Sequence, residues 1–165
     1  MPIDSDELTR LYGEFHQQLF TCALVITCVP MRAEDAVHDA FCQLLRSPAH
    51  PQDLKAYVFR AVRNAALDQL RRNPPPSEAL PNFIFDSNPP PSHVAEEAEF
   101  RQRVVEFMQR LTADQRETIV QHLYGELTFQ QIATVRELPV GTIVSWYRRG
   151  LAKLRRELEF ADGPV

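Results

Sequence analysis

Apolar residues recur at helical spacing through most of the chain, and no segment shows the two-residue alternation of a half-buried β-strand. The first half contains a series of such helical runs. The first run begins at Asp4-x-x-Glu7, a capping-box pattern, and Pro30 is expected to end it. Further runs cover about 33–46 and, after a cap at Asp53, about 54–72. The first half is therefore predicted to be a small bundle of three to four helices.

The second half ends in a short helix, a turn and a long helix. Apolar positions over about 100–111 predict one helix, and two capping-box patterns open the next two. These boxes are Thr112-x-x-Gln115 and Thr128-x-x-Gln131. Pro139 marks the turn after the short helix, and a long amphipathic run follows it. This order is typical of a helix-turn-helix domain.

A proline-rich, acidic segment separates the two halves. Residues 74–99 contain seven of the 13 prolines and five acidic side chains, without a basic one. Proline removes a backbone donor and disfavours helix in the residue before it, so this segment is predicted to be a linker. The expected fold class is all-α, with two small helical domains, 1–73 and 100–165, joined by the linker. The linker contains an apolar segment, Phe83-Ile84-Phe85, which is expected either to pack on a neighbouring domain or to dock a partner.

Positive charge is concentrated in two stretches of a chain whose net charge is −4. Residues 54–73 carry five basic and one acidic side chain, and residues 140–165 carry five basic and three acidic ones. The net charge excludes a protein that is basic over its whole surface. The two positive stretches are the places expected to meet phosphate.

The sequence contains no motif for a metal, a disulfide framework or a membrane span. The cysteines, Cys22, Cys28 and Cys42, lack C-x-x-C spacing and lie in apolar runs, which is typical of buried thiols in a reducing compartment. The acidic start is unlike a signal peptide, and the apolar stretch 19–31 is too short and too polar to cross a bilayer. We expect a soluble, cytoplasmic protein without membrane insertion and without cofactors. Catalytic motifs are also missing, so the chain is not expected to be an enzyme.

One side of the third predicted helix is basic and rich in hydrogen-bonding groups. At 100° per residue a narrow sector contains Arg60, Asn64, Asp68 and Arg71, with Lys55, Arg63 and Arg72 at its edges. Guanidinium groups bind phosphates, and asparagine pairs with an adenine edge, so this face suits nucleic acid. The alternative is a solvated face with local ion pairs such as Asp68 to Arg72.

The final helix also has two different sides. Apolar residues from Val140 to Leu158 lie on one side, and the other side carries Thr142, Ser145, Arg149, Lys153 and Arg156. The first polar residues of such a helix can enter a major groove, while the later cations meet phosphates. Those cations are Arg148, Lys153, Arg155 and Arg156. A helical hairpin with a basic exposed side would give a similar pattern, so both interpretations stay open here.

The first half contains the motifs RAEDAVHDAFCQLL and KAYVFRAVRNAALDQLRR, and the second contains LTADQRETIVQHLYGELTFQQIA and VGTIVSWYRRGLAKLR. Together they resemble the motifs of one family, the extracytoplasmic-function sigma factors of bacterial RNA polymerase. Each is similar to a motif of the family, in the family's order. The resemblance covers about 8–73 and 100–158. It implies a first domain that binds the polymerase clamp and opens the minus-ten element, and a second domain that recognises the minus-thirty-five element.

The resemblance also implies roles for individual positions. The clamp-binding segment corresponds to Glu34, Asp35, Asp39 and Phe41, whose acidic groups would meet a basic partner helix. Phe41 lies on the apolar stripe, which favours core packing instead. The loop 47–53 corresponds to the place where family members hold a flipped base of the non-template strand, next to the basic helix face.

Several positions depart from the family pattern. Tyr57 stands where the family usually has Trp, and His38 and Gln131 also differ. In the helix-turn-helix, Val144 and Trp146 replace common basic residues, Gly150 replaces Ala, and Glu137 replaces the glycine of the turn. Trp146 is expected either to contact a thymine methyl or sugar, or to pack against the linker or a partner.

The favoured interpretation is a sigma factor that directs core RNA polymerase to specific promoters and takes part in promoter melting. Its expected partners are core RNA polymerase and promoter DNA, with an anti-sigma factor as a further candidate. Two alternatives remain, a stand-alone helix-turn-helix regulator and a sigma-like interaction protein without promoter activity. The first alternative predicts tight, salt-sensitive DNA binding by the free chain.

Overall fold

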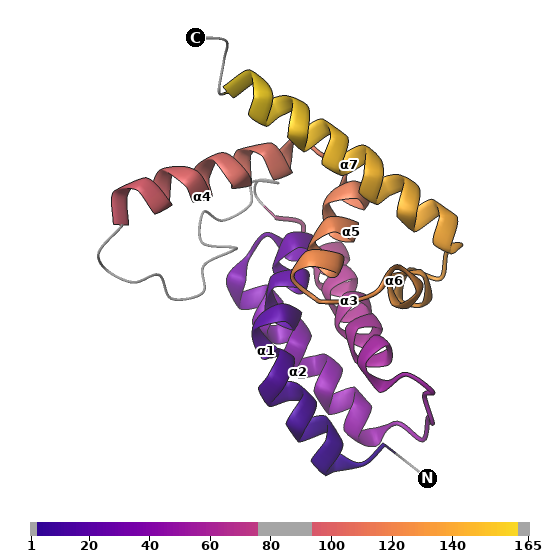
Figure 1. Ribbon diagram of the computed structural model, residues 1–165. Coiled ribbons are helices and arrows are strands. Elements are labelled where there is room, and N and C mark those ends of the chain that lie inside the picture. The colour runs from indigo at the N-terminus through magenta and orange to yellow at the C-terminus, as the bar shows by residue number, and fades with distance from the viewer. Residues whose placement is uncertain (1–2, 76–93, 162–165) are drawn as a thin grey trace.

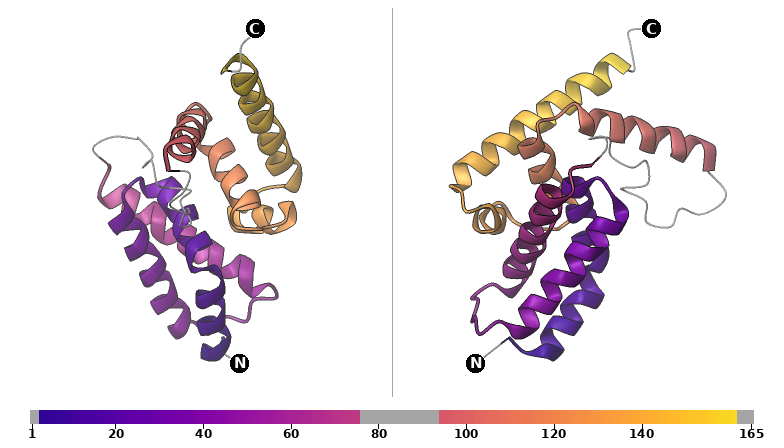
Figure 2. Two further views of the ribbon diagram at one scale, coloured as in Figure 1. Left: turned by 60° about the vertical axis from the view of Figure 1, so that its left-hand side comes forward. Right: turned by 180° about the vertical axis from the view of Figure 1, so that it is seen from behind.

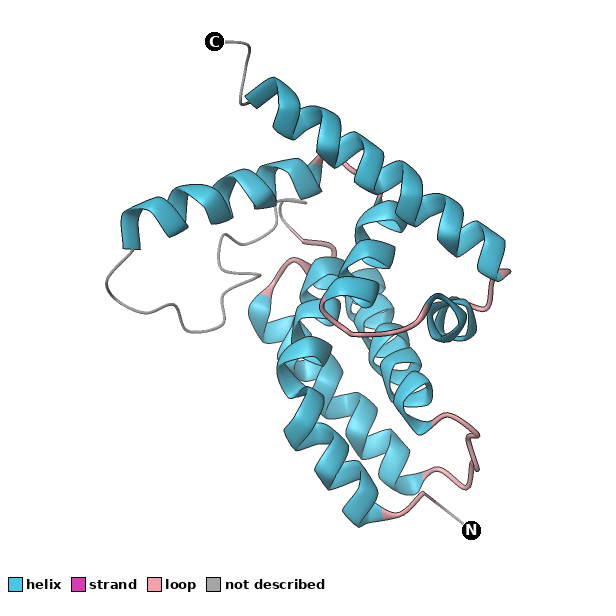
Figure 3. Ribbon diagram, in the orientation of Figure 1, coloured by secondary structure: helices cyan, strands magenta, loops and turns pink. Residues whose placement is uncertain are grey.

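The computed structural model describes residues 3–75 and 94–161, and in these residues every regular element is an α-helix. Figures 1 and 3 show their arrangement. The helices are α1 (Ser5–Thr27), α2 (Pro30–Arg46), α3 (Leu54–Arg72), α4 (Val94–Gln109), α5 (Ala113–Leu123), α6 (Phe129–Arg136) and α7 (Val140–Ala161). The all-α prediction is confirmed. The apolar segment 83–85 lies outside the described residues.

The first three helices pack against one another as the predicted bundle (Figure 1). Local caps begin two of them: the Asp4 carboxylate accepts from the Asp6 amide at 3.1 Å, and the Asp53 carboxylate accepts from the Ala56 amide at 3.0 Å. Pro30 does not simply stop α1. It is the first residue of α2, a position where its missing amide hydrogen costs nothing, so α2 begins before the predicted boundary.

The C-terminal half contains four helices in the described residues. Both predicted capping boxes are present, with reciprocal bonds of 3.2 Å at Thr112 and Gln115, and of 2.9 and 3.1 Å at Thr128 and Gln131. The start of α4 differs from the prediction, because α4 begins at Val94, inside the predicted linker. The Ala and Glu residues that follow Pro91 are strong helix formers, and they extend this helix toward the prolines.

The two halves share one hydrophobic core instead of forming separate cores. Helix α1 packs against α5, and α3 packs against α6, so the buried cluster continues from Leu24 and Val58 to Ile132. Figure 2 shows the contact between the bundle and the C-terminal helices from two further sides. Gly125 lies at this junction. A Cβ atom there would come within 2.6 Å of the Gln121 carbonyl oxygen and 3.2 Å of the Phe59 ring, so the absence of a side chain permits the close approach.

Among residues 3–75 and 94–161, none of the helices combines the length and the apolar character needed to cross a membrane.

Candidate polymerase and nucleic-acid interfaces

The outer face of α2 is acidic and exposed. Glu34, Asp35 and Asp39 all lie at the surface of this helix, and Glu34 is 3.5 Å from the imidazole of His16 on α1. Phe41 points the other way and is 9% exposed. Its ring packs edge-on against Tyr12, with 5.0 Å between centroids. The acidic residues of the predicted clamp-binding segment are thus available to a partner, whereas Phe41 belongs to the core, as its place on the apolar stripe indicated.

A pocket opens between the end of α2 and the first half of α3. Its volume is about 480 Å³, and its walls are formed by Gln43, Leu44, Ser47, Tyr57, Arg60, Ala61 and Asn64. Two residues of the predicted basic face, Arg60 and Asn64, therefore meet an aromatic ring and the first residue of the loop 47–53. An aromatic ring, an amide and a guanidinium group together can stack on, pair with and neutralise an extruded nucleotide. Tyr57 lines this pocket, a position that the basic pattern alone did not indicate.

The C-terminal end of the same face carries local ion pairs. Asp68 lies 3.5 Å from Arg71 and 3.9 Å from Arg72. These pairs are the ones that the solvated-face interpretation predicted, and all three side chains are largely exposed. Such exposed pairs are weak, so the arginines could exchange Asp68 for a phosphate at little cost.

The remaining predicted cations of α3 contact the C-terminal half. Arg60 forms an ion pair with Glu137, and Arg63 forms one with Glu117. The Lys55 ammonium donates to the main-chain oxygen of Glu126 at 3.0 Å. It also lies 4.4 Å from the centre of the Phe15 ring. Sequence periodicity placed these cations on a face but carried no signal for their partners, which are more than 50 residues away.

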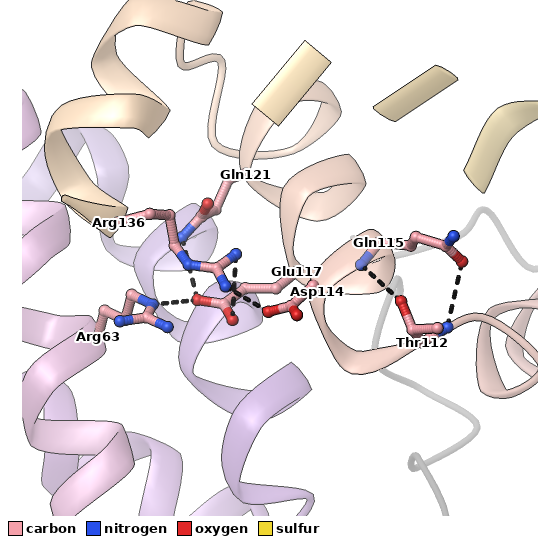
Figure 4. A network of polar contacts seen from close by, with 7 residues as sticks. All are labelled: Arg63, Thr112, Asp114, Gln115, Glu117, Gln121 and Arg136. Carbon is pink, nitrogen blue, oxygen red and sulfur yellow. Dashed lines mark hydrogen bonds and ion pairs between the residues drawn. The ribbon is translucent and has the colours of Figure 1, made fainter. Parts of the chain in front are cut away.

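Glu117 stands in the middle of a charged network that joins α3, α5 and α6 (Figure 4). Its carboxylate pairs with Arg63 and lies 3.6 Å from Arg136, and it also accepts from the Gln121 amide at 3.4 Å. Arg136 lies 2.5 Å from Asp114. The side chains of Arg136 and Glu117 are only 4% and 9% exposed, so the network is removed from solvent and depends on its internal pairing.

The second predicted DNA-binding surface lies on α7. Arg148, Arg149, Arg155 and Arg156 are exposed there, whereas Thr142 and Ser145 are half-buried near the start of the helix. Lys153 is partly buried, and its ammonium donates to the main-chain oxygen of Arg110. The arginines are therefore the more accessible cations of this surface.

Trp146 and Gly150 face the interior of the C-terminal half. The Trp146 ring packs on the core, with the Arg136 guanidinium 5.1 Å from its centre. The indole thus lies over the guanidinium of the buried network, a contact that neither sequence interpretation included. At Gly150 a Cβ atom would come within 2.7 Å of the tip of the Ile119 side chain, so the alanine of the family would require that side chain to shift.

A metal centre has no support in the part of the chain that the structure describes, since no three His, Cys, Asp or Glu side chains are grouped there in a way that could hold an ion.

Comparison with known proteins matches both halves. Residues 11–74 match the family described as Sigma-70 region 2, and residues 101–154 match Sigma-70, region 4. The chain is 30% identical over 163 residues to the ECF RNA polymerase sigma factor RpoE of Cereibacter sphaeroides, which covers 94% of this chain and 88% of that protein. The chain belongs to the extracytoplasmic-function sigma factors. The resemblance found in its motifs is confirmed.

This sigma factor has further relatives in sequence and in structure. It is 27% identical over 161 residues to SigK of Mycobacterium sp. strain KMS, covering 92% of this chain and 83% of that protein. Two solved structures share the fold. CnrH, in complex with the cytosolic domain of CnrY, gives a TM-score of 0.64 at 20% identity, over 94% of this chain and 90% of that one. RpoE of Bartonella quintana, in complex with the anti-sigma factor NepR, gives a TM-score of 0.65 at 21% identity, over 93% of this chain and 94% of that one.

Proposed function

We propose that this sigma factor acts in the cytoplasm, docks on core RNA polymerase through its first domain, and holds promoter DNA with both domains. It contributes binding alone and carries out no catalytic step. The separation of charge supports these two roles. Exposed acids on α2 suit polymerase docking, and exposed arginines on α7 suit DNA binding.

Polymerase docking is assigned to Glu34, Asp35 and Asp39. They project from one helix that the core anchors from behind through Phe41. Carboxylates on a rigid helix suit a basic partner helix, because charge complementarity speeds the encounter and fixes the register. Since the three acids contact no cation of the C-terminal half among the described residues, docking requires no change in the fold.

The pocket between α2 and α3 is assigned to a base flipped out of the minus-ten element. Tyr57 supplies a ring for stacking, Asn64 an amide for the base edge, and Arg60 a charge for the neighbouring phosphate. The proposed DNA-binding surface of the same helix also includes Lys55, Arg63, Asp68 and Arg71. Melting is favoured when the extruded base and its strand are bound more tightly than the paired duplex.

The minus-thirty-five element is assigned to α7. Thr142, Ser145 and Arg149 face the bases in the major groove, and Arg148 and Lys153 contact phosphates with the arginines further along. Trp146 lies beside this surface and supports it through Arg136. It therefore contributes to DNA binding by positioning the helix, in addition to any direct contact.

An anti-sigma factor is proposed as a regulatory partner. Both structural neighbours are complexes, one with an anti-sigma factor and one with the cytosolic domain of CnrY. A cavity of about 600 Å³ lies between the two halves of this chain, and apolar side chains line it from each half, including Ile26, Leu70 and Leu111. An amphipathic helix of a partner fits such a lining.

The test is reconstitution with purified bacterial core RNA polymerase. Size-exclusion chromatography should give a complex, and run-off transcription on genomic fragments should give discrete transcripts that depend on the protein. A complex without transcripts would instead favour a sigma-like interaction protein. DNA binding without a complex would favour a stand-alone regulator.

A further inference from the structure

The long helix α7 begins with exposed apolar side chains. Leu138 is 36% exposed and Val140 is 41% exposed, and Pro139 between them also lies at the surface. These three residues, the apolar tip of α7, belong to the turn between α6 and α7 and to the first position of α7, at the outer edge of the molecule (Figure 1). Sequence periodicity placed Val140 on the packed side of the helix. In the structure that side begins at Ile143, which is fully buried.

The apolar tip is more accessible than the polar residues assigned to the bases. Thr142 and Ser145 are half-buried. Gly141 adds no side chain, and nothing lies within 4 Å of the position that its Cβ atom would take. Over residues 138–145 the exposed side chains are therefore those of the apolar tip. A molecule that meets this end of α7 contacts an apolar surface first.

Duplex DNA is the partner that fits this position on the helix. The exposed cations Arg148 and Arg149 follow about two turns later on α7, and both suit phosphate. In helix-turn-helix domains the first residues of the second helix meet the base edges of the major groove. The C5-methyl group of thymine is the apolar group that the bases present there. An exposed leucine and valine beside arginines therefore match thymines flanked by the phosphate backbone.

Hydrogen bonds of the main chain hold the apolar tip in position. The Leu138 amide donates to the Ala133 oxygen at 3.1 Å, and the Thr142 amide donates to the Pro139 oxygen at 3.0 Å. The ring of Pro139 also fixes its own φ angle. Side chains on a preformed turn lose little freedom on binding, so the free energy of burying them against a methyl group is retained as affinity.

We propose that Leu138 and Val140 recognise thymines of the minus-thirty-five element through the C5-methyl groups of these bases. The inference rests on the proposed function, which assigns this element to α7. Burial of one methyl group changes affinity by about fourfold. Cytosine lacks this methyl group, and adenine and guanine present polar nitrogen and oxygen atoms in the major groove. The apolar tip thus adds a preference for thymine that the arginines of α7 do not provide.

Deoxyuridine tests this contact, because uracil has the same hydrogen-bonding groups as thymine and lacks only the C5-methyl group. The thymines of the minus-thirty-five element are replaced one at a time in a promoter found by run-off transcription. Competition binding then measures the affinity of the holoenzyme for each duplex. We expect a loss of about fourfold at one or two positions. Wild-type holoenzyme that binds every uracil duplex as tightly as the thymine duplex, or a minus-thirty-five element without thymine, would overturn the proposal.

Variants of the apolar tip show whether these residues make the contact. Leu138→Ala and Val140→Ala should each bind the thymine promoter about fourfold more weakly, and each should no longer distinguish uracil from thymine at one position. Leu158→Ala is the matched control. It removes a leucine that is 44% exposed, about five turns from the start of α7, and should keep the wild-type loss with uracil.

Folding of these variants is checked by circular dichroism. All three side chains are more than one-third exposed, so the thermal midpoints should match that of the wild type. A wild-type uracil effect in both Leu138→Ala and Val140→Ala would contradict the assignment.

Transcription separates this inference from the proposed function. A holoenzyme that initiates from its promoter and ignores uracil refutes thymine recognition alone. If core polymerase gives no complex and no transcripts, the function fails, and the free chain is tested on random duplexes made with thymine or with uracil. Weaker binding to the uracil pool that disappears in Leu138→Ala or Val140→Ala would then support thymine recognition by α7 without a sigma function. Equal binding to both pools would overturn the proposal as well.

Discussion

Glu117 and Arg63 form an ion pair across the two halves of the chain, and their side chains are 9% and 18% exposed. A charge removed from water is costly unless it is paired. Glu117 meets this requirement twice, because its second oxygen faces the buried guanidinium of Arg136 at 3.6 Å. The pair therefore joins α3 to α5, and its carboxylate also neutralises the positive charge of Arg136.

Replacement of Glu117 should destabilise the protein strongly. Glu117→Ala leaves two cations around a site that has lost its carboxylate, and breaking a buried pair in this way costs about 3–5 kcal/mol. Urea denaturation followed by circular dichroism measures the loss. Asp114→Ala is the matched control, since Asp114 is 52% exposed and Arg136 keeps Glu117 without it. That change removes the hydrogen bond of the buried Arg136 guanidinium but leaves the Glu117 carboxylate 3.6 Å from it, so it should cost about 1–3 kcal/mol, less than Glu117→Ala. Similar losses in the two variants would mean that Glu117 has no special role.

Much of the fold follows from local sequence signals. Helix caps depend on side chains that lie within four residues of one another, so a short sequence pattern predicts them. This holds for the capping boxes at Thr112 and Thr128 and for the cap at Asp53. Phe41 could be assigned to the core from its stripe position, and the helix-turn-helix from its order of elements. The early start of α4 is not predicted, because the prolines indicate a linker over the whole segment although its end is rich in Ala and Glu.

The partners of the basic face could not be predicted from one sequence. Periodicity places Arg60 and Arg63 on a side of a helix, but it does not encode which distant acid meets them. Their partners are 77 and 54 residues away. Trp146 shows the same limit, because its aromatic ring fits a DNA surface or an interior equally well by pattern. In the structure the ring lies over the buried guanidinium of Arg136, and that contact depends on how α6 and α7 pack.

Two glycines should respond to alanine in opposite directions. Gly13 lies within α1, and a Cβ atom there meets nothing within 4 Å, so Gly13→Ala should add about 1 kcal/mol through helix propensity. At Gly125 the same atom would come within 2.6 Å of a main-chain oxygen, so Gly125→Ala should cost about 1–3 kcal/mol. Each kcal/mol should move the thermal midpoint by about 2–4 °C. A Gly125→Ala protein as stable as the wild type would show that the junction with Phe59 can relax.

Loss of an acid on α2 should weaken polymerase binding. Asp35→Lys reverses one exposed charge of the proposed docking face and should slow association with core polymerase, most clearly at low salt. Glu14→Lys changes the net charge equally at an exposed site on α1. Biosensor kinetics on immobilised core polymerase at two salt concentrations measure the difference. Equal slowing by both variants would point to net charge and would remove α2 from the interface.

Arg149 should contribute to sequence-specific contact with the upstream element. Arg149→Ala removes an exposed guanidinium from the first half of α7 and should weaken holoenzyme binding to its own promoter by about 1–3 kcal/mol. Arg156→Ala removes another exposed guanidinium two turns later, where a phosphate contact is expected to weaken all sequences alike. Competition between promoter and random duplex gives the specificity ratio. A ratio that falls no further with Arg149→Ala than with Arg156→Ala would contradict base readout by this residue.

The buried thiol of Cys22 should make stability depend on alkaline pH. Burial, and secondarily the negative charge of Glu117, raise the pKa of this thiol well above its ordinary value. The folded state therefore holds a proton that the unfolded chain releases above a pKa of about 8.5. The contribution of this thiol to the free energy of unfolding is fully present below that pH. Above it, the free energy of unfolding should fall by up to about 1.4 kcal/mol per pH unit.

Urea denaturation between pH 7 and pH 10 measures this decline, and the variants identify its source. Cys22→Ala should lower stability at neutral pH through a small cavity, yet should flatten the curve above pH 9 because no thiol remains to ionise there. Cys42→Ala changes a half-buried residue of α2 and leaves Cys22 in place, so the decline should persist. A curve that is equally steep with and without Cys22 would assign the alkaline loss to another group.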